Sequence, residues 1–463
     1  MFIGREKELN ALNKMYAKDS FQMAVVYGRR RIGKTSLLNE FIKNKTALYF
    51  PAEEVNELLN LEKFSKILGN AMGIENFPRA ENWNDFFSII DDYFKEQRLV
   101  LIIDEYPYVA TANKSLNSIL QHIIDYKYKN SNIFLILCGS SMSFMENQVL
   151  GEKSPLFGRR TGQLKINPLD YYDAAQFYPN ATSEEKIKYY ATVGGTPYYL
   201  SLIDPKRSFE ENIKDFYFEI SGYLFNEGTL LMKQEFREPA NYNAVLQAIS
   251  SGAVTLNEIV QFTHLETNLI SKYLMTLQEL NYIERVIPFG SNPLKGKKSQ
   301  YHITENFIAF WYRYVFSVRS EIERGNGDIY CSLALNGLSE FVGPVFEEIT
   351  RQYLRRVNAT EKLPFVAKSF GKWWGKDNQG SPQEIDIILE SMNSKELIIG
   401  ECKWKSTFKV NEAVNTLKTR TEIFNNYKTH LYLFSKTELN ETKDINTISI
   451  NQFFDESLKI TQS

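Results

Sequence analysis

The chain has few cysteines, little net charge and no long hydrophobic run. Its 463 residues include three cysteines, Cys138, Cys331 and Cys402, too few and too scattered for a disulfide framework, so we expect a reducing compartment. The formal net charge of −2 argues against a globally basic nucleic-acid binder, while leaving room for a local basic patch. No apolar run reaches the length of a membrane span, and the start Met-Phe-Ile-Gly-Arg lacks the apolar region of a signal peptide. We therefore expect a cytoplasmic protein without a membrane partner.

One stretch near the start carries a phosphate-binding pattern. An apolar run suited to a buried strand ends at Gly28, and a helix is expected to begin near Gly33. Between them lies G-x-x-x-x-G-K-[ST], whose glycines let backbone N–H groups turn toward phosphate oxygens at a helix N-terminus. Lys34 is expected to reach the β- and γ-phosphates of ATP, and the Thr35 hydroxyl is expected to bind Mg²⁺. The predicted nucleotide-binding residues of this loop are Gly28, Arg29, Arg30, Arg31, Ile32, Gly33, Lys34, Thr35 and Ser36.

A second apolar run ends in two acids, Asp104 and Glu105. Asp104 is placed to support the Mg²⁺ ion together with Thr35, and Glu105 to orient or deprotonate the attacking water. Ser140 and Ser141, which end the next apolar run, are weaker candidates for contacts with the γ-phosphate or its water. Strands that alternate with helices in this way predict a doubly wound α/β domain with a parallel sheet.

An arginine pair, Arg159 and Arg160, follows the last of these strands and is flanked by glycines. Such a pair is a candidate arginine finger, which offers positive charge to the transferring phosphoryl group. The alternative is a pair of surface arginines, and the sequence leaves both interpretations open. A finger that acts across a subunit interface would require an oligomer.

Five motifs together resemble the archaeal-type AAA ATPases of the signal-transducing ATPase class with numerous domains. They are the Phe-x-Gly-Arg-Glu start, the Gly-Arg-Arg-Arg-x-Gly-Lys-Thr-Ser loop, the apolar-Asp-Glu strand, the Pro-Leu-x-Gly-Arg-Arg segment and the Gly-Gly-x-Pro turn. The resemblance covers the first half of the chain and implies an AAA-type core followed by a helical lid. It also implies that the turn formed by Gly194, Gly195 and Pro197 lies in this lid and senses the nucleotide.

Residues 237–304 show three short helical patterns and then two strands around a loop rich in glycine and lysine. Three helices and a β-wing predict a winged helix. A DNA-binding role would place the third helix in the major groove, yet this helix carries only Lys272, and the wing adds Lys295, Lys297 and Lys298. We favour a packing or regulatory spacer, with DNA contact as the alternative.

The far end of the chain carries a second set of charged residues. An alternating strand presents Glu384 and Asp386 on one face, and the next strand ends in Gly-Glu401-Cys-Lys403-Trp, which places Glu401 and Lys403 on one face. We expect Asp386, Glu401 and Lys403 to converge, because the two strands are expected to pair. Two carboxylates and an ammonium group suit Mg²⁺-assisted phosphodiester hydrolysis. The alternative is a solvated strand face, which the apolar lead-in to Glu401 makes less favourable.

This end of the chain resembles a C-terminal domain of unknown function attached to the same ATPases, itself similar to the PD-(D/E)xK nuclease fold. The matching features are the helix glutamate Glu347, the acids Glu384 and Asp386, the Gly-Glu-Cys-Lys-Trp strand end and a preceding Lys-Trp-Trp. The resemblance implies a restriction-endonuclease-like α/β fold in which Glu347, Asp386 and Glu401 are metal ligands. Many domains of this fold only bind, so cleavage stays open.

We therefore expect a multidomain α/β protein that uses ATP and Mg²⁺. Its predicted parts are a P-loop AAA-type core in 1–168, a helical lid in 169–236, a winged helix in 237–304, a helical connector in 305–335 and a nuclease-like domain in 336–463. The predicted function is an ATP-hydrolysing switch whose nucleotide state regulates a nuclease-like domain acting on nucleic acid. The alternatives are an ATP-controlled scaffold and a DNA-binding regulator with an inactive far domain. DNA, a protein partner and a second copy of the chain are the candidate partners besides ATP and ADP.

Overall fold

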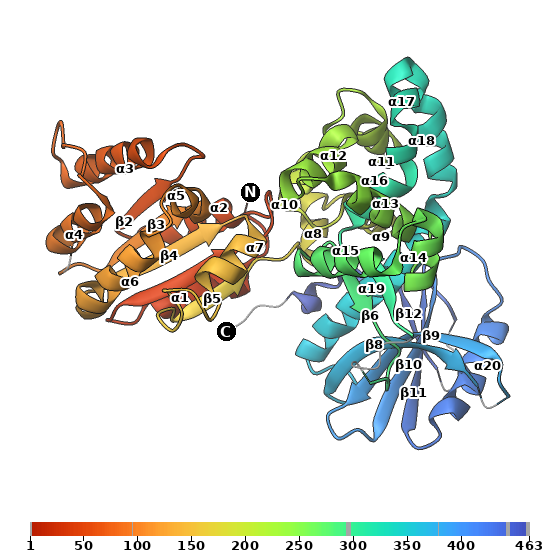
Figure 1. Ribbon diagram of the computed structural model, residues 1–463. Coiled ribbons are helices and arrows are strands. Elements are labelled where there is room, and N and C mark those ends of the chain that lie inside the picture. The colour runs from red at the N-terminus through yellow and green to blue at the C-terminus, as the bar shows by residue number, and fades with distance from the viewer. Residues whose placement is uncertain (1, 95, 293–297, 378, 441–444, 460–463) are drawn as a thin grey trace. The chain divides into compact units, whose positions relative to one another are not determined.

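The structure is a computed structural model that describes the chain except residues 1, 95, 293–297, 378, 441–444 and 460–463. The wing lysines Lys295 and Lys297 therefore lie outside the described residues. The chain divides into two compact units (Figure 1). The first contains the chain up to Pro168 together with Thr196–Tyr198, and the second contains Leu169–Gly195 and the chain from Tyr199 onward. The chain thus enters the second unit, returns to the first for the short Thr196–Tyr198 segment, and then enters the second unit again.

The first unit is built on a five-stranded parallel sheet with the order β2-β3-β4-β1-β5, which confirms the predicted parallel α/β core. The three central strands are buried along their whole length, as expected of continuous apolar runs covered on both faces. The strands are β1 (Gln22–Tyr27), β2 (Ala47–Pro51), β3 (Leu99–Asp104), β4 (Ile133–Gly139) and β5 (Gly162–Lys165). The helices include α1 (Glu6–Tyr16), α2 (Lys34–Ile42), α3 (Glu57–Met72), α4 (Trp83–Phe94), α5 (Tyr106–Ala112), α6 (Leu116–Tyr126) and α7 (Met142–Phe144).

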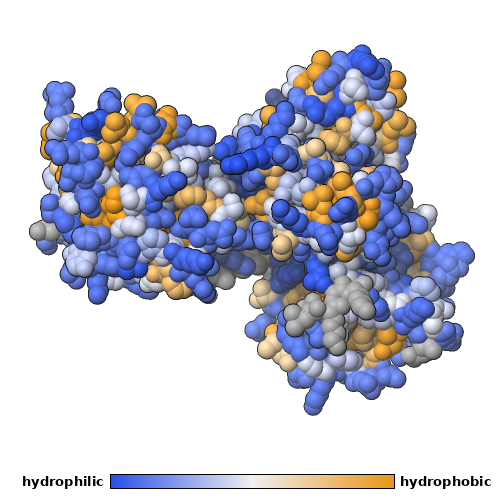
Figure 2. Space-filling view, in the orientation of Figure 1, coloured by the Kyte–Doolittle hydropathy of each residue, from blue (hydrophilic) through white to orange (hydrophobic). Residues whose placement is uncertain are grey.

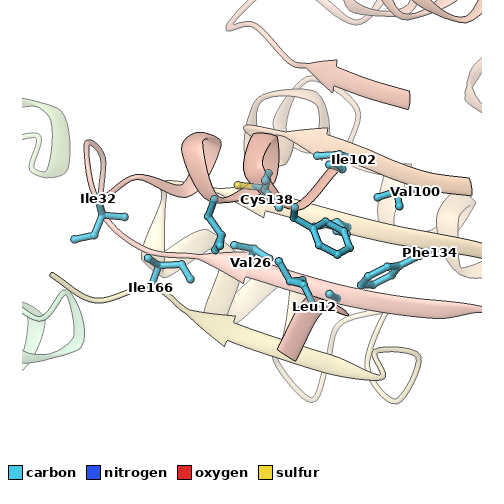
Figure 3. Close-up of a cluster of buried hydrophobic side chains, with 13 residues drawn as sticks. Leu12, Val26, Ile32, Val100, Ile102, Phe134, Cys138 and Ile166 are labelled. Atoms are coloured by element: carbon cyan, nitrogen blue, oxygen red, sulfur yellow. The ribbon is translucent and has the colours of Figure 1, made fainter. Parts of the chain in front are cut away.

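A hydrophobic layer fixes α2 against this sheet (Figure 3). Val26 of β1, Ile102 of β3 and Cys138 of β4 contribute to it from the strands, and Leu12 of α1 closes one side. All four side chains are fully buried. Because α2 begins directly after the loop that follows β1, this packing holds both ends of that loop in place.

The second unit begins with short helices in the region predicted as a helical lid, residues 169–236. Pro179 interrupts the helices of this region, because proline cannot donate a backbone hydrogen bond to a continuing helix, and Thr182 then caps a new helix through a capping box with Glu185. A left-handed Gly194 ends that helix. The helices up to residue 235 are α8 (Tyr171–Ala174), α9 (Ser183–Val193), α10 (Pro197–Leu200), which begins in the first unit, α11 (Phe209–Ile213) and α12 (Tyr223–Glu235).

Three further helices and a two-stranded antiparallel sheet occupy the region predicted as a winged helix, a designation that stays a prediction. They are α13 (Pro239–Ser250), α14 (Leu256–Thr263), α15 (Thr267–Glu279), β6 (Ile283–Val286) and β7 (Gln300–Ile303). The connector that follows contains α16 (Asn306–Tyr314), α17 (Arg319–Glu321) and α18 (Gly327–Asn336). Trp311 of α16 is fully buried and its indole N–H donates to the Phe225 carbonyl of α12, 2.9 Å away, so the connector is a packing element.

The C-terminal part forms a second five-stranded sheet, with the order β12-β11-β10-β9-β8. β9 runs antiparallel to its neighbours β8 and β10, and β10, β11 and β12 run parallel. Its elements are α19 (Leu338–Ala359), β8 (Ala367–Lys376), β9 (Pro382–Ser391), β10 (Glu396–Lys403), α20 (Val410–Thr421), β11 (Lys428–Ser435) and β12 (Asn446–Ser449).

The surface view shows mainly hydrophilic side chains with separate hydrophobic groups (Figure 2). Among the described residues, no single helix is long and apolar enough to cross a membrane. The helix pair 306–336 and 338–359, bent by 53°, meets the length and composition requirement only when the two are taken together.

Phe453 provides a test of the C-terminal core. Its ring is fully buried and stacks on Tyr353 with centroids 4.3 Å apart, and it also packs on Phe346. We expect Phe453→Ala to lower the free energy of unfolding of the second unit by about 3–5 kcal/mol, measured by denaturant titration. The partly exposed neighbour Phe454 is the matched control, and its replacement by alanine should cost clearly less. Equal losses for both variants would contradict this packing.

Candidate functional site

The loop between β1 and α2 closes around its own lysine. Lys34 is the first residue of α2 and is 6% exposed. Its amine donates to the carbonyl oxygens of Gly28 and Arg29, each 2.9 Å away. Arg31 and Gly33 adopt left-handed backbone angles, with φ of 67° and 89°, which turns the loop sharply before the helix begins. The amine therefore lies at the centre of the loop, where the phosphate groups of a nucleotide would bind.

Two contacts from distant segments hold this loop. The buried Arg5 donates through Nη2 to the Ile32 carbonyl, 3.1 Å away, so the N-terminal segment supports the loop backbone. On the other side, Pro197 lies beside Gly33, close enough that a Cβ added to this glycine would stand 3.7 Å from the proline Cγ. The predicted lid residue Pro197 is thus a neighbour of the phosphate loop inside the first unit. The sequence alone indicates no role for Arg5.

The remaining loop residues differ in their surroundings. Arg30 donates to the hydroxyl of Tyr108, 2.7 Å away, and the guanidinium of Arg31 lies 5.9 Å from the ring centroid of Tyr198. Thr35 and Ser36 are exposed at the start of α2.

Asp104 ends β3 with its carboxylate held by several donors. Oδ2 accepts from Thr35 Oγ1, 3.0 Å away, and from the hydroxyl of Tyr49, while Oδ1 accepts from the backbone N–H of Glu105 at 3.0 Å. Burial and the charge of Asp104 raise the pKa of Tyr49, so this phenol keeps its proton and donates. Tyr49 lies on the neighbouring strand β2, and the sequence analysis missed it. The hydroxyl and carboxylate oxygens of Thr35 and Asp104 are the ligand type that Mg²⁺ prefers, so this pair fits the predicted metal role.

Glu105 follows Asp104 in a left-handed conformation, with φ of 50°. Its Oε2 accepts from Ser140 twice, from the backbone N–H at 3.1 Å and from the hydroxyl at 2.8 Å. The side chain predicted to prepare the water is therefore positioned by the end of β4. Ser140, considered for a phosphate contact from the sequence, has Glu105 as its partner here.

The two candidate finger arginines are held by neighbouring residues of the first unit. Arg159 donates to both carboxylate oxygens of Asp125, at 2.9 and 2.6 Å, and these hydrogen bonds lower the pKa of Asp125. Arg160 donates through Nη1 to the Leu150 carbonyl, 3.0 Å away. A finger role for either arginine stays a prediction.

In the second unit, the charged residues predicted at the far end lie on β9 and β10. Asp386 accepts through Oδ2 from the backbone N–H of Cys402, 2.8 Å away, so the acid of β9 reaches the strand that carries the other two. Glu401 is 7% exposed, and its two oxygens accept from different cations. Lys403 donates to one oxygen at 2.6 Å, and Arg420 of α20 donates to the other. The sequence analysis missed Arg420, because nothing in the local pattern links α20 to this strand.

Glu347 of α19 and Asp386 are carboxyl groups of this centre with raised pKa values. Burial, the charge of Asp386 and smaller contributions raise the pKa of Glu347 to about 8, while the nearby cations Lys372 and Arg351 oppose the shift. Burial and the charge of Glu401 raise the pKa of Asp386 to about 7. Arg351 also donates to the Asp386 carbonyl, 3.0 Å away, which ties α19 to β9.

The C-terminal residues fit the predicted metal only in part. In the described portion of the chain, no group of three or more His, Cys, Asp or Glu side chains is arranged to hold a metal ion. Glu401 forms ion pairs with Lys403 and Arg420. The metal roles of Glu347, Asp386 and Glu401 therefore stay predictions.

Comparison with known proteins agrees with this two-part organisation. Residues 2–203 match a family described as an ATPase domain predominantly from Archaea, and residues 311–416 match one described as archaeal and bacterial proteins of unknown function. An uncharacterized protein of Methanocaldococcus jannaschii is 36% identical over 405 residues, which are 88% of this chain and 88% of that protein. The chain belongs to this archaeal ATPase family.

Two further similarities concern the ATPase part. An uncharacterized ATP-binding protein of Methanocaldococcus jannaschii is 40% identical over 45 residues, covering 10% of this chain and 76% of that protein. A Walker-type ATPase of Pyrococcus abyssi superimposes with a TM-score of 0.51 at 18% identity, covering 67% of this chain and 96% of that structure, which shows a shared fold. This archaeal ATPase family member therefore has a P-loop ATPase fold and an ATP-binding domain of the ATPase type.

The raised pKa values of Glu347 and Asp386 predict an unusual pH dependence of stability. Between about pH 4 and pH 8 the folded chain holds more protons on these carboxyl groups than the unfolded chain, so its stability falls as the pH rises through 7 and 8. Without divalent cations, we expect the second unit to melt at a lower temperature at pH 8 than at pH 6. Glu347→Gln should reduce this difference, whereas Glu340→Gln on the exposed side of α19 should not. Equal melting temperatures of the wild type at both pH values would contradict the assignment.

Proposed function

We propose that the chain is a Mg²⁺-dependent ATP-hydrolysing switch whose nucleotide state regulates a C-terminal domain that acts on nucleic acid. The observation that carries the ATPase half is the meeting of Lys34, Thr35, Asp104 and Glu105 at one end of a parallel sheet, in a chain of an ATPase family. The regulatory half is supported by contacts within the second unit that connect Gly195, the residue before Thr196–Tyr198, to α19 through Leu169 and Asp170.

Each side chain of the nucleotide site has a distinct part in this mechanism. The Lys34 amine exchanges its bonds to loop carbonyls for the phosphate oxygens of ATP. Thr35 and Asp104 would hold Mg²⁺, which supplies positive charge to the phosphate groups when it is bound. Glu105 orients the attacking water or accepts its proton, and the two hydrogen bonds from Ser140 fix the position from which it does so.

The segment that borders the phosphate loop is continuous with the segment that holds the C-terminal domain. Thr196–Tyr198 belongs to the first unit, and the residue before it, Gly195, accepts a backbone hydrogen bond from Leu169, 2.8 Å away. Asp170 follows Leu169 directly. Its carboxylate accepts hydrogen bonds from Nε and Nη2 of Arg356 on α19, at 2.6 and 2.7 Å. A movement of the loop-side segment that follows nucleotide binding would therefore reach α19, the helix that also carries Glu347.

A nuclease-like activity is supported by the order helix, three strands, helix and two strands, and by the acids on β9 and β10. A second candidate, nucleic-acid binding without cleavage, is favoured by one specific observation. Both oxygens of Glu401 accept from cations, Lys403 and Arg420, so this acid is already neutralised within the protein.

The ATPase half is tested with two variants. Lys34→Ala should lose ATP binding, because the amine that meets the phosphates is absent. Glu105→Gln should bind ATP normally and hydrolyse it about 10²–10⁴-fold more slowly, because the amide cannot accept the proton. Fluorescent-nucleotide titration measures the first effect and phosphate release the second, with the exposed Glu54→Gln as control. Undiminished phosphate release by Glu105→Gln would exclude the role assigned to this residue.

The nucleic-acid half is tested by incubating the full chain with DNA and Mg²⁺ or Mn²⁺, with and without ATP. We expect cleavage that disappears in Lys403→Ala, changes in Lys34→Ala and persists in Lys405→Ala, whose lysine is exposed two residues further along. If the DNA stays intact in all wild-type reactions while ATP is still hydrolysed, the nuclease hypothesis is wrong. Nucleic-acid binding without cleavage is then the function that remains.

A further inference from the structure

Lys372 stands at an irregular point of the C-terminal sheet. The pairing of β8 with β9 is interrupted between Gly371 and Trp373, and the skipped part of β9 contains Asp386. A β-bulge of this kind turns a side chain away from its regular direction and is common next to functional sites. The irregularity thus brings the Lys372 position opposite one of the acids of the centre.

The Lys372 side chain is buried and makes no ion pair with the described residues. The residue is 8% exposed, and its amine lies 5.4 Å from the ring centroid of Trp374. Within the described part of the chain, neither an ion pair nor a hydrogen bond involves this amine. Its charge opposes the rise in the pKa of Glu347 and of Glu284 on β6, which indicates that these groups face the same space. Burying an ammonium group without a partner is unfavourable, so this arrangement favours an anion that arrives from outside.

The β6–β7 hairpin forms the other side of this space. The backbone N–H of Phe289 donates to the Lys372 carbonyl, 2.9 Å away, and the Phe289 ring packs on Phe424 with centroids 6.1 Å apart. His302 of β7 faces the same cations, since burial together with the charges of Lys372 and Arg351 lowers its pKa to about 3. The imidazole is therefore neutral near pH 7 and can donate or accept a hydrogen bond.

We propose that Lys372 binds a phosphodiester group of a nucleic-acid strand, in a composite site made by the β6–β7 hairpin and the C-terminal domain. The bound phosphodiester lies next to Asp386 and Glu347. The inference rests on the proposed function of the C-terminal domain, and it adds a binding residue and a contribution of the hairpin. A phosphodiester carries one negative charge, so the neighbouring acids repel it less than a free phosphate or terminal phosphate, which carries close to two.

The test measures binding of fluorescent oligonucleotides to the full chain by anisotropy, with Ca²⁺ in place of Mg²⁺. Single-stranded DNA, double-stranded DNA and single-stranded RNA identify the source of the phosphodiester. For the strand that binds, we expect Lys372→Met to weaken affinity about tenfold and to reduce the dependence of log K on log salt by about one. Lys376→Met, at the exposed end of the same strand, should change affinity less than about twofold, since exposed lysines contribute little.

Stability separates a binding role from a structural one. Lys372→Met should unfold at about the same temperature as the wild type, because removing a buried charge without an ion pair offsets the loss of its attraction to Glu347. Lys372→Gln is the second variant and should show the same loss of affinity. If both variants bind the oligonucleotide with wild-type affinity, the role of Lys372 is wrong and the proposed function is unaffected. The same holds if inorganic phosphate competes for the site as strongly as unlabelled oligonucleotide does. A wild type that binds none of the three strands would overturn the nucleic-acid half of the proposed function together with this inference.

Discussion

The guanidinium of Arg356 is the contact that joins the start of the second unit to helix α19. It is 5% exposed, donates to both oxygens of Asp170, reaches Asp173 at 2.8 Å and lies 4.5 Å from the ring centroid of Tyr172. Paired donation from a planar guanidinium fixes direction as well as distance. The start of the second unit and helix α19 are therefore held in one relative orientation. Tyr171 strengthens this arrangement, since its hydroxyl donates to the Phe453 carbonyl at 2.8 Å.

The nucleotide site and the C-terminal centre differ in how many of their charged side chains have hydrogen-bond or ion-pair partners within the described protein. In the nucleotide site, Lys34, Asp104 and Glu105 each have hydrogen-bond partners that hold them ready for a ligand. In the C-terminal centre, Glu347 and Asp386 are half-buried with raised pKa values, and the buried Lys372 makes no ion pair with the described residues. Unfavourable electrostatics of this kind are typical of functional sites, where a ligand supplies the missing charge. We interpret the C-terminal centre as the part of the molecule that changes most when its ligand binds.

The sequence alone predicted structure and chemistry correctly wherever one short segment determines both. The phosphate loop at Lys34 and the acids after β3 are of this kind, because strand, turn and helix follow one another directly. It was insufficient where function depends on residues far apart in the chain. Tyr49 with Asp104, Arg420 with Glu401 and Arg356 with Asp170 are contacts that only the folded chain brings together, and no local periodicity marks them. For the same reason the sequence predicted the acids on β9 and β10 together with Lys403, but not that Arg420 also pairs with Glu401.

Hydrogen–deuterium exchange of α19 tests the central claim, that nucleotide state reaches the C-terminal domain through Arg356. The wild type, Arg356→Met and the neighbouring control Arg355→Met would be compared with and without ATP and Mg²⁺. We expect ATP to change exchange in residues 338–359 of the wild type and of the control. The change should be absent in Arg356→Met, with ATP hydrolysis retained. Exchange in α19 that is the same with and without ATP in the wild type would contradict the account.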